Sequence, residues 1–131
     1  MSGQDLDAGA HGVQVPWVNS VAEVLDVVTA TKYQPLGDRG LAGSRQGGWG
    51  LTEPLAAFTT RANRETLVVI HIETAAAAAA AEQYTAVGDV DVLFIGPTDL
   101  SHSLGHPGNP AHPEVREVME QVADVVAASE K

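Results

Sequence analysis

The sequence contains no cysteine, few basic residues and few aromatic residues. Without cysteine there is neither a disulfide framework nor a thiolate metal site, so any metal must be held by oxygen or imidazole, and a hard divalent cation is the default. Seven Lys and Arg against 17 Asp and Glu give a net charge of −10. This balance argues against nucleic acids and anionic membrane surfaces as partners.

Long apolar runs are missing as well. No stretch reaches the roughly 18 residues of a membrane-spanning helix, and the opening sequence MSGQDLDAGAHG lacks the basic and apolar regions of a signal peptide. We therefore expect a cytoplasmic protein with no membrane contact. With 131 residues, 44% of them hydrophobic, the chain is long enough for one domain with a modest core.

Two apolar segments of strand length stand out, LVVIHIET over residues 67–74 and VDVLFIGPTDLS over residues 90–101. Such runs without polar alternation are typical of parallel strands covered on both faces. The first closes with Glu73, and Asp99 follows the second. Since ligands bind at the C-terminal ends of parallel strands, these two acids could share one cation, although either could instead cap a helix.

The rest of the chain alternates in the same way. The pattern predicts a strand over residues 12–18, a helix capped by Asn19 or Ser20, a helix from Thr52 to Asn63, a helix opening with seven alanines, a helical turn over 99–104 and a helix over 114–128. Three alternations of strand and helix predict an α/β fold with parallel strands, about half of an eightfold barrel.

A glycine-rich loop is expected over residues 32–50. It carries Arg39 and Arg45, so it could form a lid or an anion-binding rim, or it could be a plain surface loop. It is not a nucleotide-binding P-loop, because no Gly-Lys-Ser/Thr follows at the required spacing.

Further candidates lie close to the two acids. Gly96 and Pro97 would let the backbone approach a ligand, and the N–H groups of Thr98 and Asp99 would point at a carboxylate group. His71 is two residues before Glu73 on the same strand face, where it could bond a ligand or a metal, or simply be a satisfied histidine in a barrel wall. The other histidines suit solvated or capping roles, and the sequence offers no candidate for nucleophilic catalysis.

Taken in order and spacing, DLDAGAHGVQVPWVNS, KYQPLGDRG, LVVIHIET, VDVLFIGPTDLS and SLGHPGNPAHPEV resemble the HpcH/HpaI aldolase family of the phosphoenolpyruvate/pyruvate-barrel superfamily. The resemblance implies a (β/α)8 TIM barrel, usually oligomeric, that reversibly cleaves 4-hydroxy-2-oxo acids to pyruvate and an aldehyde with a bound magnesium, manganese or cobalt ion. It also implies that residues 1–131 form a single incomplete domain, the fourth to sixth βα units of that barrel.

The resemblance assigns roles to individual residues. Glu73 and Asp99 match the metal ligands, and Thr98 and Asp99 match backbone contacts to the pyruvate carboxylate. His71 stands where the family commonly has a glutamine that hydrogen-bonds the substrate. Asp7 matches the acid that raises the basicity of the family's catalytic histidine. That histidine and an arginine that steadies the enolate oxygen lie on strands upstream of this chain, so we expect little turnover from the chain alone.

Two other functions remain open. The chain could be a non-catalytic metal-binding remnant or a fragment completed by a partner, since an open three-strand piece exposes sheet edges and apolar surface. It could also be a citrate-lyase-type enzyme acting on coenzyme A thioesters, which the FIGPTDLS form makes the weaker alternative.

Overall fold

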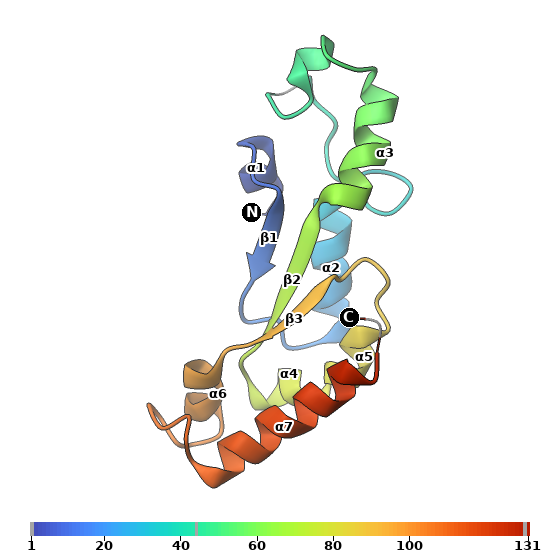
Figure 1. Ribbon diagram of the computed structural model, residues 1–131. Coiled ribbons are helices and arrows are strands. Elements are labelled where there is room, and N and C mark those ends of the chain that lie inside the picture. Colours follow the sequence, from blue (N-terminus) through green and yellow to red (C-terminus); the bar gives the residue numbers. More distant parts are fainter. Residues whose placement is uncertain (1, 44, 130) are drawn as a thin grey trace.

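A computed structural model describes residues 2–43, 45–129 and 131. Its centre is a sheet of three parallel strands, β1 (Gly12–Val15), β2 (Leu67–Ile72) and β3 (Val92–Ile95), in the order β1-β2-β3 (Figure 1). Val15 pairs with Ile70, and Ile72 pairs with Ile95. The α/β class and the parallel arrangement expected from the sequence are confirmed.

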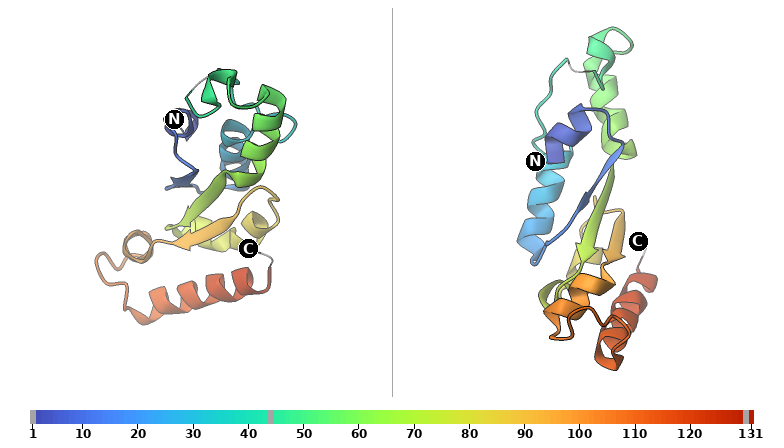
Figure 2. Two further views of the ribbon diagram at one scale, coloured as in Figure 1. Left: turned by 45° about the horizontal axis from the view of Figure 1, so that its top comes forward. Right: turned by 90° about the vertical axis from the view of Figure 1, so that its left-hand side faces the viewer.

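Helices connect and flank the strands. They are α1 (Ser2–Asp7), α2 (Val21–Thr31), the 3-10 helix η1 (Gly48–Gly50), α3 (Leu55–Glu65), α4 (Ala75–Ala79), α5 (Ala81–Thr85), α6 (Pro97–Ser103) and α7 (Pro113–Ala127). Helix α7 packs against α5 and runs alongside the sheet (Figure 2). In the part of the chain that the structure describes, no helix is long and apolar enough to cross a membrane.

The sheet has one covered and one open face. Val68, Ile70 and Ile72 are fully buried against the helices and form the centre of the core. Their neighbours along the strands point the other way, and Leu67 and Phe94 keep 46% and 47% of their surface exposed. The expectation that both faces are covered is therefore wrong for this chain, because its helices lie on one side.

Three local expectations also need correction. Helix α3 begins at Leu55 after Pro54, whose fixed φ suits a helix start, rather than at Thr52. The alanine run breaks at Ala80 into α4 and α5, since packing rather than propensity decides its path. In α2, capped by Ser20, helical spacing groups Leu25 with Val21, Val24 and Val28 on one face, but Leu25 is 50% exposed.

The N-terminal end of the sheet, where the strands begin, is closed by buried polar groups. Lys32 is 3% exposed and donates to the carbonyl oxygens of Asn63 and Thr66 at 2.9 and 2.8 Å. These carbonyls lie at the C-terminal end of α3, where the helix leaves carbonyls without intrahelical partners and favours a positive charge. The Asn63 side chain in turn holds the backbone of Tyr33 through two hydrogen bonds. The hydrogen bonds of Lys32 and Asn63 thus form a buried network that stabilises this end of the sheet.

Candidate functional site

Glu73 lies at the opposite, C-terminal end of the sheet, directly after β2. Its side chain is only 5% exposed. One oxygen, Oε1, accepts a hydrogen bond from the backbone N–H of Trp17 at 2.6 Å, and the other, Oε2, lies 3.0 Å from Nδ1 of His71. A buried carboxylate with these two partners is fixed in position, which is what a metal ligand requires.

His71 is surrounded by groups from all three strands. Nδ1 faces Glu73, Nε2 contacts the side-chain amide of Gln14 on β1, and the ring lies 5.0 Å from the ring of Phe94 on β3. The open face of the sheet therefore carries this imidazole next to Glu73. Gln14 was not among the residues expected from the sequence. It pairs with Val69, two residues before His71 on β2, and therefore lies on the same face of the sheet as His71.

The start of α6 approaches Glu73 closely. Gly96 donates its N–H to the carbonyl of Ile72 at 3.0 Å, and a Cβ added at Gly96 would lie 3.1 Å from Oε2 of Glu73. Only glycine gives the carboxylate this room. Thr98 and Asp99 follow in the first turn of α6, both exposed, with N–H groups of the kind that have no acceptor within a helix.

The predicted metal ligands are thus placed at one end of the sheet on adjacent elements. Glu73 follows β2, and Asp99 follows β3, whose last residue pairs with the last residue of β2. Two carboxylates suffice for a hard divalent cation, which keeps waters or substrate oxygens in its remaining positions. Whether the two carboxylates converge on one point stays a prediction.

Asp7 lies away from this group. It ends α1, before β1 begins, so it sits at the N-terminal end of the sheet (Figure 1). Its Oδ1 is 2.7 Å from Nη2 of Arg39, whose side chain is 2% exposed. Arg39 also lies 4.7 Å above the ring of Tyr33, so this residue of the 32–50 loop is buried against its neighbours, and an anion-binding role for it stays a prediction. The predicted link between Asp7 and a catalytic base stays untested.

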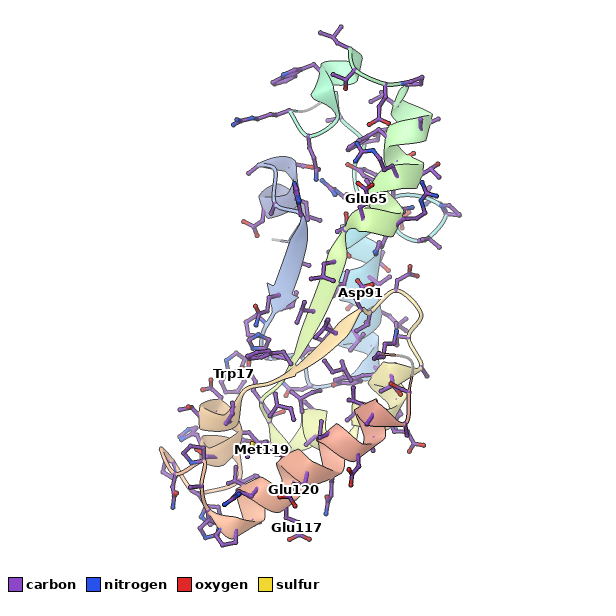
Figure 3. The ribbon with its side chains drawn as sticks, in the orientation of Figure 1. Trp17, Glu65, Asp91, Glu117, Met119 and Glu120 are labelled. Atoms are coloured by element: carbon purple, nitrogen blue, oxygen red, sulfur yellow. The ribbon has the colours of Figure 1, made fainter. Side chains whose placement is uncertain are left out.

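Trp17 is a site residue that the sequence did not single out. Its backbone has a φ of 57°, in the left-handed region that residues other than glycine seldom adopt. This conformation directs the backbone N–H of Trp17 at Glu73. The side-chain amide of Asn19 donates to the Trp17 carbonyl oxygen at 3.1 Å and so holds the same residue in place. Figure 3 shows Trp17 where β1 ends, near the segment that joins β3 to α6. Backbone strain of this kind clusters at functional sites.

Comparison with protein families matches residues 2–131 to the model described as HpcH/HpaI aldolase/citrate lyase. Among curated proteins, the chain is 40% identical over 128 residues to the 4-hydroxy-2-oxovalerate aldolase of Rhodococcus jostii, covering 98% of this chain and 48% of that protein. It is 42% identical over 115 residues to the 2-dehydro-3,6-dideoxy-6-sulfogluconate aldolase of Pseudomonas putida, covering 85% and 43%. The chain spans about half the length of these relatives.

Solved structures give the same picture. The chain superposes with a TM-score of 0.88 on an HpcH/HpaI aldolase/citrate lyase family protein from Burkholderia cenocepacia, with 31% sequence identity. The match covers 96% of this chain and 50% of that structure. These neighbours are barrels of the TIM type, so the three strands correspond to part of a barrel wall. The open face of the sheet is then the face that lines a barrel interior.

Proposed function

Because the chain belongs to the HpcH/HpaI aldolase/citrate lyase family, we propose that it carries the cation-binding part of an aldolase active site. The reaction is the reversible cleavage of a 4-hydroxy-2-oxo acid to pyruvate and an aldehyde. The observation that carries this proposal is the buried Glu73 carboxylate, held by Trp17 and His71 beside the start of α6.

Glu73 and Asp99 would hold a magnesium, manganese or cobalt ion, because oxygen ligands suit hard divalent cations. When bound, such an ion supplies Lewis-acid stabilisation for the negative charge that develops on a 2-oxo acid during carbon–carbon cleavage. The two contacts of Glu73 keep its carboxylate in place before any ligand binds, so little reorganisation accompanies binding.

The oxo acid would bind between α6 and His71. The free N–H groups of Thr98 and Asp99 at the start of α6 suit the carboxylate of pyruvate. His71 would donate a hydrogen bond to the same end of the substrate from Nε2, which would exchange its contact with Gln14 for the substrate.

Asp7 is proposed to support a catalytic base that residues 1–131 do not supply. In this chain it lies at the end of the sheet away from Glu73 and pairs with Arg39. Cleavage needs a proton acceptor for the 4-hydroxyl, and general acid–base groups typically contribute about 10²- to 10⁴-fold. A cytoplasmic location and assembly into homo-oligomers belong to the same proposal.

A second candidate function is that of a fragment completed by another polypeptide. The observation that favours it is the open face of the sheet, where Leu67, Val92 and Phe94 are 39–47% exposed. Apolar side chains grouped on one face of a sheet mark a surface that gains free energy when it is covered. A complementary set of barrel strands fits that surface.

Calorimetric titration with Mn²⁺ tests the cation site. We expect one ion per chain, with affinity reduced at least about tenfold in Glu73→Gln and in Asp99→Asn, because each removes a charged ligand. Glu120→Gln, an exposed acid on α7 (Figure 3), is the matched control and should bind as the unchanged protein does. If all three variants bind Mn²⁺ with equal affinity, Glu73 and Asp99 are not metal ligands.

Pyruvate release tests whether residues 1–131 are sufficient for catalysis. With saturating Mn²⁺ and a 4-hydroxy-2-oxo acid, the chain alone should turn over slowly or not at all, because the base is missing. Turnover comparable to that of a full-length relative would overturn this expectation and point to a base within residues 1–131.

A further inference from the structure

Two histidines and a glutamate come together where the chain turns from α6 into α7. His106 and His112 stack with ring centroids 3.5 Å apart and an interplanar angle of 15°. Nε2 of His106 lies 2.8 Å from Oε2 of Glu114. One ligand atom from each of the three side chains lies within 4.8 Å of the other two. The sequence suggested only solvated or capping roles for these histidines.

The turn that carries this cluster is ordered by its backbone. Three backbone hydrogen bonds hold it. The N–H of His106 donates to the carbonyl of Ser101 at 2.8 Å, that of Asn109 to the carbonyl of His106 at 3.0 Å, and that of His112 to the carbonyl of Asn109 at 3.1 Å. Three prolines in the same segment restrict φ further. The two imidazoles and the carboxylate are therefore presented by a fixed frame, and bringing them onto an ion requires side-chain adjustment alone.

The donor set determines which ion would suit. Two imidazole nitrogens and one carboxylate are the ligands of a three-residue zinc site with a fourth position open to water. Metal–ligand distances of about 2.0 to 2.1 Å in a tetrahedron place ligand atoms roughly 3.3 Å apart. The His106–Glu114 distance is already shorter than this, and no two of the three ligand atoms lie more than 4.8 Å apart. Side-chain movements of about 1 to 2 Å that also tilt the stacked rings apart would complete the geometry.

We propose that His106, His112 and Glu114 form a second cation site, separate from the Glu73 site, that takes a borderline transition-metal ion such as Zn²⁺. The ion would replace the proton shared between His106 and Glu114 and would pull His112 away from the weak 3.3 Å contact with the Glu114 N–H. Bound there, it would fasten the turn to the first residues of α7.

Electrostatics act on this site in two directions. The hydrogen bond from His106 lowers the pKa of Glu114, so the carboxylate is available as a charged ligand. The N-terminal end of α7 opposes a cation through the helix dipole. Glu114 and Glu117, both in the first turns of α7, offset that field, and Figure 3 shows Glu117 on the outer side of the helix.

Zinc titration of the whole chain tests the proposal. The Glu73→Gln background with excess Mg²⁺ keeps Zn²⁺ away from the first site. We expect one Zn²⁺ per chain, with the dissociation constant raised roughly 10- to 100-fold in His106→Ala and in Glu114→Gln. The matched control is His102→Ala, which removes an exposed histidine on the neighbouring helix α6. It should leave zinc binding unchanged.

A second measurement locates the ion. In ¹H–¹⁵N spectra, Zn²⁺ should shift the signals of residues 105–116 and leave those of β2 in place. Circular dichroism of each variant checks that α7 is intact. The proposal is overturned if His106→Ala and His102→Ala bind Zn²⁺ equally, if the shifts fall elsewhere, or if no binding is detected.

Discussion

The two ends of the sheet bury charged side chains in different ways. At the N-terminal end, Lys32 is capped by two carbonyl oxygens, and Arg39 pairs with Asp7. At the C-terminal end, the buried carboxylate of Glu73 contacts one backbone N–H and one imidazole, and the acid that should join it, Asp99, is exposed. At the N-terminal end the charged groups are held by contacts within the chain, and only Nε and Nη1 of the buried Arg39 have no hydrogen-bond partner among the described residues. The C-terminal end keeps carboxylates available for a ligand.

This difference matches what a barrel wall requires. Ligands bind at the C-terminal ends of the strands, and residues at the opposite end contribute to stability. Substitutions at the N-terminal end should therefore lower the free energy of unfolding, and substitutions at the C-terminal end should mainly change binding. Lys32→Met and Gly96→Ala, with the larger expected effects, test this contrast directly. Thr74→Ala and His106→Ala, with smaller expected effects, test a helix cap after β2 and the turn before α7.

Lys32→Met should lower the free energy of unfolding by about 2 to 3 kcal/mol, because it leaves two buried carbonyl oxygens without donors. Urea denaturation measures this loss. Arg64→Met, an exposed basic residue in the last turn of α3, is the control and should stay within about 0.5 kcal/mol of the unchanged protein. Equal stability of the two variants would mean that the N-terminal end is not a structural network.

Gly96→Ala should weaken Mn²⁺ binding about tenfold and lower stability by about 1 kcal/mol, because the new Cβ would stand 3.0 Å from Cβ of Glu73 and force that side chain to move. Calorimetry and urea denaturation measure the two effects. At Gly88 a Cβ would meet nothing within 4 Å, so Gly88→Ala serves as the control. Unchanged Mn²⁺ affinity in Gly96→Ala would contradict the role of Glu73 as a metal ligand.

Thr74→Ala removes the N-cap of α4, since the Thr74 hydroxyl accepts from the N–H of Ala77 at 3.1 Å. Loss of such a cap costs about 1 kcal/mol. Thr60→Ala, at an exposed position inside α3, should be neutral because alanine is a better helix former. If Thr74→Ala is also neutral, the alanine run that follows β2 holds its place by packing alone.

His106→Ala should have the smallest effect, on acid stability. Because His106 lowers the pKa of Glu114 below its usual 4.5, this pair stabilises the fold above that pH, and the stabilisation is lost as the pH falls through the lowered value. In His106→Ala the Glu114 pKa should return toward 4.5, and that part of the acid sensitivity should disappear. NMR titration of the Glu114 carboxyl group measures this pKa directly. An unchanged Glu114 pKa in His106→Ala would contradict the hydrogen bond between His106 and Glu114.

Much of this arrangement follows from local sequence. The apolar runs predict β2 and β3, and the acids after them predict Glu73 and Asp99 at the C-terminal end. Contacts between distant segments do not follow from it. Trp17 and Glu73 are 56 positions apart, and Asp7 and Arg39 are 32 apart. These pairs depend on how the strands and loops pack, which no local pattern of residues encodes.

The backbone of Trp17 has a consequence in terms of chirality. A φ of 57° is strained for an L-residue by roughly 1 to 2 kcal/mol, but it is the ordinary helical value for the mirror-image amino acid. D-tryptophan at position 17 would therefore keep the N–H directed at Glu73 while relieving the strain. The backbone at this position thus suits a D-residue, and the sequence supplies an L-residue there that is 56% exposed.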